Sequence, residues 1–201
     1  AICDTGVPYF DLSLQHVSKA HLRRMRRWGD GERFLNRITD IRKREPDAAM
    51  RSNFIVGYPG ETEEDHDQLL NFVNEAQLDW CGFFAFSPEE GTHAVSLPDR
   101  VPAGLMNERL AELRELQDSI TARRRDDLIG EKMTVLVDEI GVARSHREAP
   151  EIDGVVHVSE TLSVATFVEV EIADALGPDL VATGANHDAN SDANELVDDA
   201  R

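Results

Sequence analysis

The turn at residues 57–61, Gly57-Tyr-Pro-Gly-Glu61, has the residue types best suited to face a ligand. It follows a short apolar run, Phe54-Ile-Val56, that is typical of a strand covered on both faces. Gly57, Pro59 and Gly60 turn the backbone sharply, and few side chains block close approach. Because ligands of α/β folds bind just outside the carboxyl ends of parallel strands, this turn is predicted to lie at a binding site. The alternative is a purely structural turn.

The charges after the turn indicate which ligand it suits. Five carboxylates begin the next segment, at Glu61, Glu63, Glu64, Asp65 and Asp67. They occupy the positive end of the helix dipole that an anion would otherwise use. A neutral or cationic ligand therefore fits better than a phosphate.

Other candidate residues follow or begin the neighbouring strands. Gln15 and His16 end one predicted strand, and the loop 87–92 follows another. Both are therefore predicted on the same rim as the turn, the edge of the sheet where the strands have their carboxyl ends. His16 is equally well explained as a hydrogen-bonded core residue, and the loop as a solvated acidic segment. Arg51 starts its strand, where it is either structural or points inward to bind a carboxylate.

The cysteines and histidines predict no metal site in this chain. Cys3 and Cys81 form no CxxC pair, and the seven histidines show no metal-ligand spacing. Cys81 lies in an apolar run and suits packing better than nucleophilic catalysis. Free cysteines, no apolar run of membrane-spanning length and no secretory signal favour a reduced, cytoplasmic location.

The elements that must position these residues alternate between strand and helix. Strands are predicted at residues 8–14, 49–56 and 80–86, and helices at 19–27, 32–44, 63–77 and 103–129. Thr62 and Asp65 suit the N-cap and N3 positions of a capping box. The alternation implies a parallel sheet with right-handed crossovers.

The pattern changes to all-β from Lys132. Four or five short strands in about 55 residues predict a small barrel. The fold class is therefore α/β plus all-β, with an α/β domain at 1–127, a barrel at 128–184 and a disordered acidic tail at 185–201. Three parallel strands leave the first one as an exposed edge, so the chain is interpreted as the C-terminal part of a longer protein.

Much of the negative charge of the chain lies in the predicted barrel. The chain carries a net charge of −18, and residues 131–184 alone carry 3 basic and 11 acidic residues. Because nucleic-acid binding depends on cationic contacts to phosphate, strong nucleic-acid binding is not expected. A basic or neutral protein surface is the predicted partner.

Five motifs follow one another along the chain: Pro8-Tyr-Phe-Asp-Leu-Ser-Leu-Gln-His16, Leu22-Arg-Arg-Met-Arg26, Arg51-Ser-Asn-Phe-Ile-Val-Gly-Tyr-Pro-Gly-Glu-Thr-Glu-Glu-Asp65, Phe86-Ser-Pro-Glu-Glu-Gly-Thr92 and Ala149-Pro-Glu-Ile-Asp-Gly-Val155. Together and in this order, they resemble the radical-SAM methylthiotransferases, most closely the type that modifies a ribosomal protein. The resemblance covers residues 7–184, and the segments 87–92 and 149–155 favour the ribosomal-protein branch over the branch that modifies tRNA.

The resemblance implies the C-terminal part of a radical-SAM partial (β/α) barrel followed by a small TRAM barrel of OB-like type. It also implies transfer of a methylthio group to the β-carbon of an aspartate in a small-subunit ribosomal protein, with a sulfur donor as a further partner. The implied cofactors are S-adenosylmethionine and two 4Fe–4S clusters in the full-length protein. This chain lacks the family's CxxxCxxC motif, so the cluster ligands are expected outside it, no catalytic residue is assigned here, and the chain alone is expected to be inactive.

By position in those motifs, the predicted cofactor-binding residues form one wall of the S-adenosylmethionine site. Phe86 and Ser87 are expected near the adenine or the substrate. The others are Gln15, His16, Arg51, Gly57, Pro59, Gly60 and Glu61. Two alternatives remain open: a tRNA-modifying methylthiotransferase, and a non-catalytic module whose barrel binds a basic protein.

Overall fold

A three-stranded parallel sheet forms the centre of the first part of the protein, as predicted. In the computed structural model, which describes residues 3–184, the strand order is β1 (Tyr9–Gln15), β2 (Ala49–Val56) and β3 (Trp80–Ala85). The bounds predicted for β2 are correct, and those for β1 and β3 are wrong by one residue. The predicted acidic tail, 185–201, lies outside the described residues.

Four α-helices connect and follow these strands: α1 (Lys19–Arg24), α2 (Gly31–Arg44), α3 (Glu63–Ala76) and α4 (Ala103–Asp126). Two short 3₁₀ helices are also present: η1 (Cys3–Thr5) precedes β1, and η2 (His93–Ser96) lies between β3 and α4. Helix α1 ends three residues before its predicted end, because Arg26 adopts a left-handed conformation with φ of 58°. Helix α4 also ends three residues early, since Gly130 turns and donates its amide to Ile172 of the barrel.

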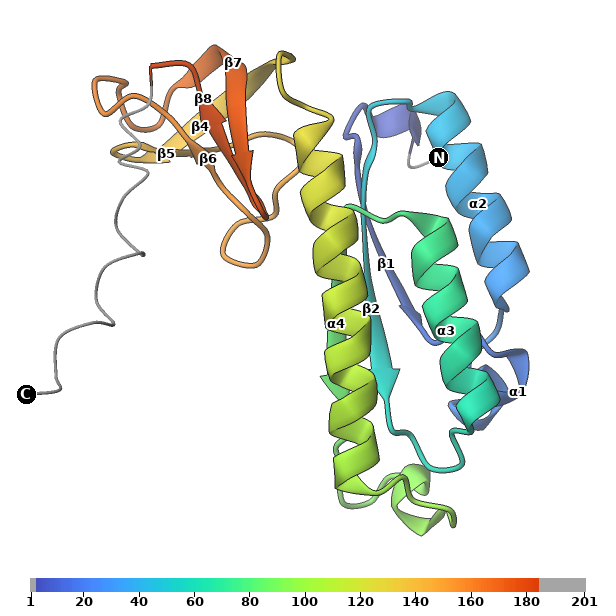
Figure 1. The fold of residues 1–201 in the computed structure, drawn as a ribbon. Coiled ribbons are helices and arrows are strands. Elements are labelled where there is room, and N and C mark those ends of the chain that lie inside the picture. Colours follow the sequence, from blue (N-terminus) through green and yellow to red (C-terminus); the bar gives the residue numbers. More distant parts are fainter. Residues whose placement is uncertain (1–2, 185–201) are drawn as a thin grey trace, which may run out of the picture.

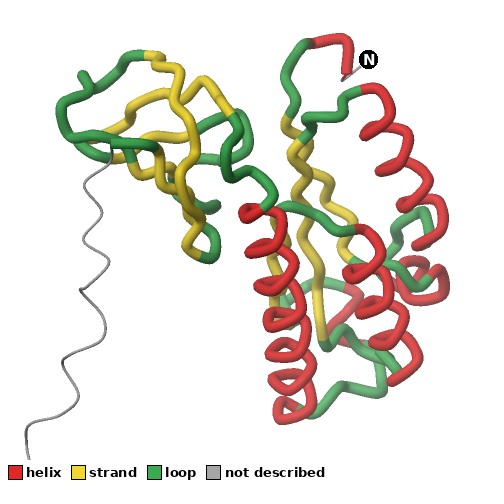
Figure 2. Tube along the Cα trace, turned by 45° about the horizontal axis from the view of Figure 1, so that its top comes forward, coloured by secondary structure: helices red, strands yellow, loops and turns green. Residues whose placement is uncertain are grey.

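The core lies between one face of the sheet and the three long helices, which run alongside it in Figures 1 and 2. Side chains alternate along β2, so that Met50, Phe54 and Val56 are buried under the helices. The helices contribute Ile38, Ile41, Leu69, Phe72, Val73, Leu110, Leu113 and Ile120. Arg51, Asn53 and Ile55 are only half-buried, and they point to the opposite face of the sheet.

A closed five-stranded barrel follows α4 and confirms the predicted OB-like part. Its strands are β4 (Lys132–Glu139), β5 (Val142–Arg144), β6 (Val156–His157), β7 (Phe167–Leu176) and β8 (Asp179–Ala182). Their order in the barrel is β4-β5-β6-β8-β7, and all neighbouring pairs are antiparallel except β6 and β8.

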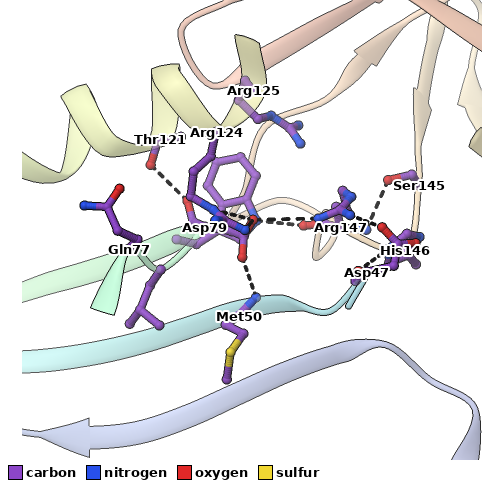
Figure 3. Close-up of polar contacts among 12 residues, drawn as sticks. Asp47, Met50, Gln77, Asp79, Thr121, Arg124, Arg125, Ser145, His146 and Arg147 are labelled. Carbon is purple, nitrogen blue, oxygen red and sulfur yellow. Dashed lines mark hydrogen bonds and ion pairs between the residues drawn. The ribbon is translucent and has the colours of Figure 1, made fainter. Parts of the chain in front are cut away.

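The barrel contacts the end of the sheet where the strands begin. At this junction Asp79 accepts hydrogen bonds from the Met50 amide at 2.8 Å and from Arg124 at 2.9 Å (Figure 3). Trp80 donates its indole N–H to the Arg147 carbonyl at 2.7 Å, and Arg125 stacks over the Trp80 ring. The barrel is thus held at the opposite end of the sheet from the turn 57–61 (Figure 1).

The division into domains at 127/128 stays a prediction, although α4 ends at Asp126 and β4 begins at Lys132. Among residues 3–184, the helices are too short or too polar to cross a membrane.

Candidate ligand-binding site

The turn 57–61 is fixed by hydrogen bonds that use most of its own amide groups. Gly57 donates to the Glu61 carboxylate at 2.7 Å, Gly60 to the Asp99 carbonyl at 2.8 Å, and Glu61 to the Tyr58 carbonyl at 3.0 Å. Pro59 has no amide hydrogen, so Tyr58 has the one remaining backbone donor of the turn. An anion would find few free backbone donors in the turn, which agrees with the expectation that it is not a phosphate site. The exposed Arg24 guanidinium donates to the Gly60 carbonyl, however, so a positive charge lies beside the turn.

Glu61, a predicted cofactor residue, is turned toward α4. Its second carboxylate oxygen accepts a hydrogen bond from Arg109 of α4 at 2.8 Å, and its side chain is only 1% exposed. Burial raises the pKa of Glu61, because it removes the carboxylate from water. Arg109 also binds Glu63 in the first turn of α3 at 2.8 Å. Glu61 therefore stabilises the turn on the side that faces α4.

His16, another predicted cofactor residue, is fully buried, as the core interpretation expected. Burial lowers the pKa of His16 to about 3 and that of its neighbour His21 to about 4, so both rings are neutral near pH 7. The Nδ1 atom of His16 accepts a hydrogen bond from the Ser18 amide, which leaves the proton of the neutral ring on Nε2.

His16, His21 and Glu61 bring potential metal ligands within 4.8 Å of one another. Sequence analysis missed this cluster, because the three residues have no metal-ligand spacing. A protonated Nε2 cannot coordinate a cation, however, and the adjacent Arg109 adds a positive charge. The cluster is therefore poorly suited to a metal ion.

A cavity of about 520 Å³ opens at the rim formed by the carboxyl ends of the strands. Its size is within the range of small-molecule sites, roughly 300–1,000 Å³. Tyr58 packs edge-on against Phe86, with ring centroids 5.1 Å apart. The lining residues are Gln15, Asn53, Ile55, Tyr58, Phe84, Ala85, Phe86, Ser87, Glu89, Thr92 and Ala94.

The cavity brings together three predicted residues from different strand ends, Gln15, Phe86 and Ser87. Gln15 has a φ of 68°, and the pairing of β1 with β2 shifts register just before it. Such unfavourable backbone conformations are concentrated at functional sites. Sequence analysis missed Ile55 and Asn53, although the alternation along β2 gives the signal that they face away from the helices.

Arg51 is not at this rim. It lies five residues before Val56, about 16 Å away along the strand at a rise of about 3.3 Å per residue. Its guanidinium donates to Asp153 of the barrel at 2.7 Å and lies 3.7 Å from Asp11. Arg51 does bind a carboxylate, but that carboxylate belongs to the protein itself.

The two cysteines do not fit a 4Fe–4S cluster, which requires several thiolates in one place. Cys3 lies in η1, beside a groove lined by Phe10 and Leu12, whereas Cys81 lies in β3. Burial raises the pKa of the Cys81 thiol well above its usual range, so the thiol stays protonated.

Two family descriptions match the chain. The radical SAM superfamily matches residues 1–73, and the TRAM domain matches residues 129–184. The first match includes β1, β2 and the turn 57–61, and the second includes the whole barrel. The first match therefore covers part of the cavity lining, namely Gln15, Asn53, Ile55 and Tyr58, and the second covers the closed barrel.

The chain is also similar to proteins named ribosomal protein uS12 methylthiotransferase RimO. The protein from Cutibacterium acnes is 46% identical over 188 residues, covering 91% of this chain and 39% of the relative. The Stenotrophomonas maltophilia protein is 47% identical over 182 residues, covering 87% and 40%. The Moorella thermoacetica protein is 50% identical over 152 residues, covering 76% and 35%. The chain spans about two fifths of the length of these relatives.

Proposed function

Because the chain belongs to the radical-SAM methylthiotransferases of the ribosomal-protein type, we propose that the protein containing it methylthiolates an aspartate of a small-subunit ribosomal protein. The observation that carries this proposal is the 46% identity over 91% of the chain to a relative named as a uS12 methylthiotransferase. The acceptor is the β-carbon of that aspartate, and the sulfur comes from a separate donor.

The rim cavity supports S-adenosylmethionine as the cofactor. Tyr58, Phe86 and Ile55 provide an apolar surface for an adenine ring, and Gln15 and Ser87 provide polar groups beside it. The turn 57–61 has most of its amide donors occupied, which suits a cofactor that, like S-adenosylmethionine, carries no phosphate. When bound, S-adenosylmethionine supplies the radical chemistry, and the protein orients the cofactor and shields it from water.

The predicted role of each site residue is refined accordingly. We propose that Gln15, Phe86 and Ser87 contact the cofactor or the substrate, and that Gly57, Pro59 and Gly60 shape the wall beside them. His16 and Glu61 are buried, and we propose that they stabilise this wall from the protein interior without contacting the cofactor. Arg51 is better assigned to the contact between the sheet and the barrel. The two 4Fe–4S clusters would be held by ligands outside this chain.

The barrel suits a basic protein partner. Its strand β7 exposes Glu169, Glu171 and Phe167, the last being 75% exposed. We therefore propose that the barrel binds the ribosomal protein substrate by charge complementarity and binds nucleic acid weakly. A ribosomal substrate also implies a cytoplasmic location.

The test is to express the full-length gene, reconstitute its iron–sulfur clusters without oxygen, and supply S-adenosylmethionine and the small ribosomal subunit. Mass spectrometry should find one added methylthio group on one aspartate of the uS12 protein. A reconstituted protein that cleaves S-adenosylmethionine but modifies tRNA instead would establish the alternative branch. No modification of either substrate would contradict the proposal.

A further inference from the structure

The N-terminal half of α4 contacts the turn 57–61 and the start of α3 through three residues on one face of the helix. Met106 occupies the space that a Cβ atom on Gly57 would need. Arg109 lies one helical turn later and binds both Glu61 and Glu63. Glu112, a further turn along, binds His66 at 2.9 Å. Residues spaced by three lie on the same side of a helix. This face of α4 therefore packs against the turn 57–61 and the first turn of α3.

Within this contact, Glu61 connects Arg109 to the backbone of the turn. One carboxylate oxygen of Glu61 accepts from Arg109, and the other accepts from the Gly57 amide. A buried carboxylate is costly unless it is paired and hydrogen-bonded. Without Arg109, Glu61 would take up a proton or move toward water, and either change would weaken its bond to Gly57.

We propose that Arg109 is a positioning residue for the rim cavity: through Glu61, it holds the turn 57–61 in the conformation that places Tyr58 against Phe86. The identity of the ligand rests on the proposed function, whereas the restraint on the turn is a property of this chain alone. A restrained turn raises the affinity for a ligand, because less conformational freedom is lost on binding.

The restraint is tested by hydrogen exchange and mass spectrometry on the full-length protein without added S-adenosylmethionine. In Arg109→Met, the amides of Gly57 and Glu61 should exchange about tenfold faster, a ratio that corresponds to loss of one charged hydrogen bond. Peptides from the centre of β2 should change much less. Arg109→Lys keeps the charge but not the forked geometry, so it should restore part of the protection.

Two controls separate positioning from general loss of stability. Arg123→Met removes the same charge from the exposed face of α4 and should leave the turn unchanged. Leu113→Ala removes a fully buried side chain of α4 that belongs to the core, so its effect should extend over the core peptides. Unchanged exchange at the turn in Arg109→Met, or equal acceleration there in Leu113→Ala, would overturn the proposal. If Arg109→Met does not fold, Arg109→Lys serves for the same comparison.

The consequence for binding is measured as the Kd for S-adenosylmethionine of the reconstituted full-length protein. Arg109→Met should raise the Kd about tenfold, and Arg123→Met should leave it unchanged. Combining Arg109→Met with Glu61→Gln should add little to either single effect, because both act through one carboxylate. A wild-type protein that binds no S-adenosylmethionine would overturn the proposed function, whereas the exchange experiment would still decide the role of Arg109.

Discussion

Two neutral histidines behind the turn should make the stability of the protein depend on pH. Burial lowers the pKa of His16 to about 3 and of His21 to about 4, whereas an unfolded histidine titrates near 6.5. As the pH falls below 6.5, the unfolded state gains protons that the folded state does not. The free energy of unfolding should therefore fall by about 1.4 kcal/mol per pH unit for each histidine.

Denaturant unfolding at several pH values between 6.5 and 4.5 checks this expectation. His21→Gln should remove one histidine's share of the slope. If His21→Gln and the wild type show equal slopes, His21 is not neutral in the folded protein.

Asp153 should contribute strongly to the stability of the junction between the sheet and the barrel. Its carboxylate is 1% exposed and accepts from the Tyr9 hydroxyl at 2.7 Å, Arg51 at 2.7 Å and the Ala149 amide at 2.9 Å. Asp153→Ala should lower the free energy of unfolding by about 3–5 kcal/mol, because it leaves Arg51 without its buried partner. Chemical denaturation measures the loss, with the exposed Glu169→Ala as a control. A loss below 1 kcal/mol, the value typical of exposed pairs, would argue against this role.

The positions of the candidate site residues were predictable where the ends of the strands alone decide them, whereas their roles stay predictions. The motifs indicated Gln15, Phe86 and Ser87, and all three line one cavity. For Arg51 they left two possibilities open, because its partner Asp153 lies 102 residues away. The same limit applies to Glu61, whose second partner, Arg109, lies 48 residues away. Long-range pairs of this kind leave no local pattern in a single sequence.

At the scale of elements, the start of α3 shows a local signal that specifies its structure. The Thr62 hydroxyl accepts from the Asp65 amide, and the Asp65 carboxylate accepts from the Thr62 amide, which confirms the predicted capping box. Thr62→Ala should lower the free energy of unfolding by about 1 kcal/mol. Thermal or denaturant unfolding measures it, and Thr62→Ser should keep most of the stability. Equal losses in both variants would show that the hydroxyl does not cap the helix.

Element ends were predicted less well where tertiary contacts decide them. Arg24, Arg26 and Arg27 continue the basic pattern of α1, but the helix ends at Arg24. Arg27 instead donates to the Ser13 carbonyl of β1, and the Tyr58 hydroxyl donates to the Arg24 carbonyl. These hydrogen bonds with β1 and the turn 57–61 stabilise the conformation in which α1 ends at Arg24. The periodicity of the sequence could not reveal them.

At the scale of the whole molecule, α4 joins the rim to the barrel. Its 24 residues span about 36 Å at 1.5 Å per residue. Arg109 near its start binds the turn, whereas Arg125 near its end binds Glu148 of the barrel region at 2.6 Å and covers Trp80. The barrel therefore lies at a fixed place relative to the cavity, so a partner bound to the barrel would be held at a defined distance from the rim.

That arrangement leads to a prediction for the acidic barrel as the docking surface of the proposed substrate. Glu169→Lys combined with Asp174→Lys changes the net charge of residues 131–184 from −8 to −4, and both side chains are exposed on β7. Association of the full-length protein with a basic ribosomal protein should slow about tenfold at low salt, because electrostatic attraction accelerates encounter. Biosensor kinetics at rising salt concentrations should show the two proteins converging as the charges are screened.

The matched control reverses two exposed carboxylates of α4 instead, Glu108→Lys and Glu115→Lys. It changes the total charge by the same amount but leaves the barrel unaltered. If docking depends on the barrel, the control should slow association much less than the β7 variant. Equal slowing in both would mean that only the net charge of the whole protein attracts the partner, and the barrel would then have no special part in substrate recognition.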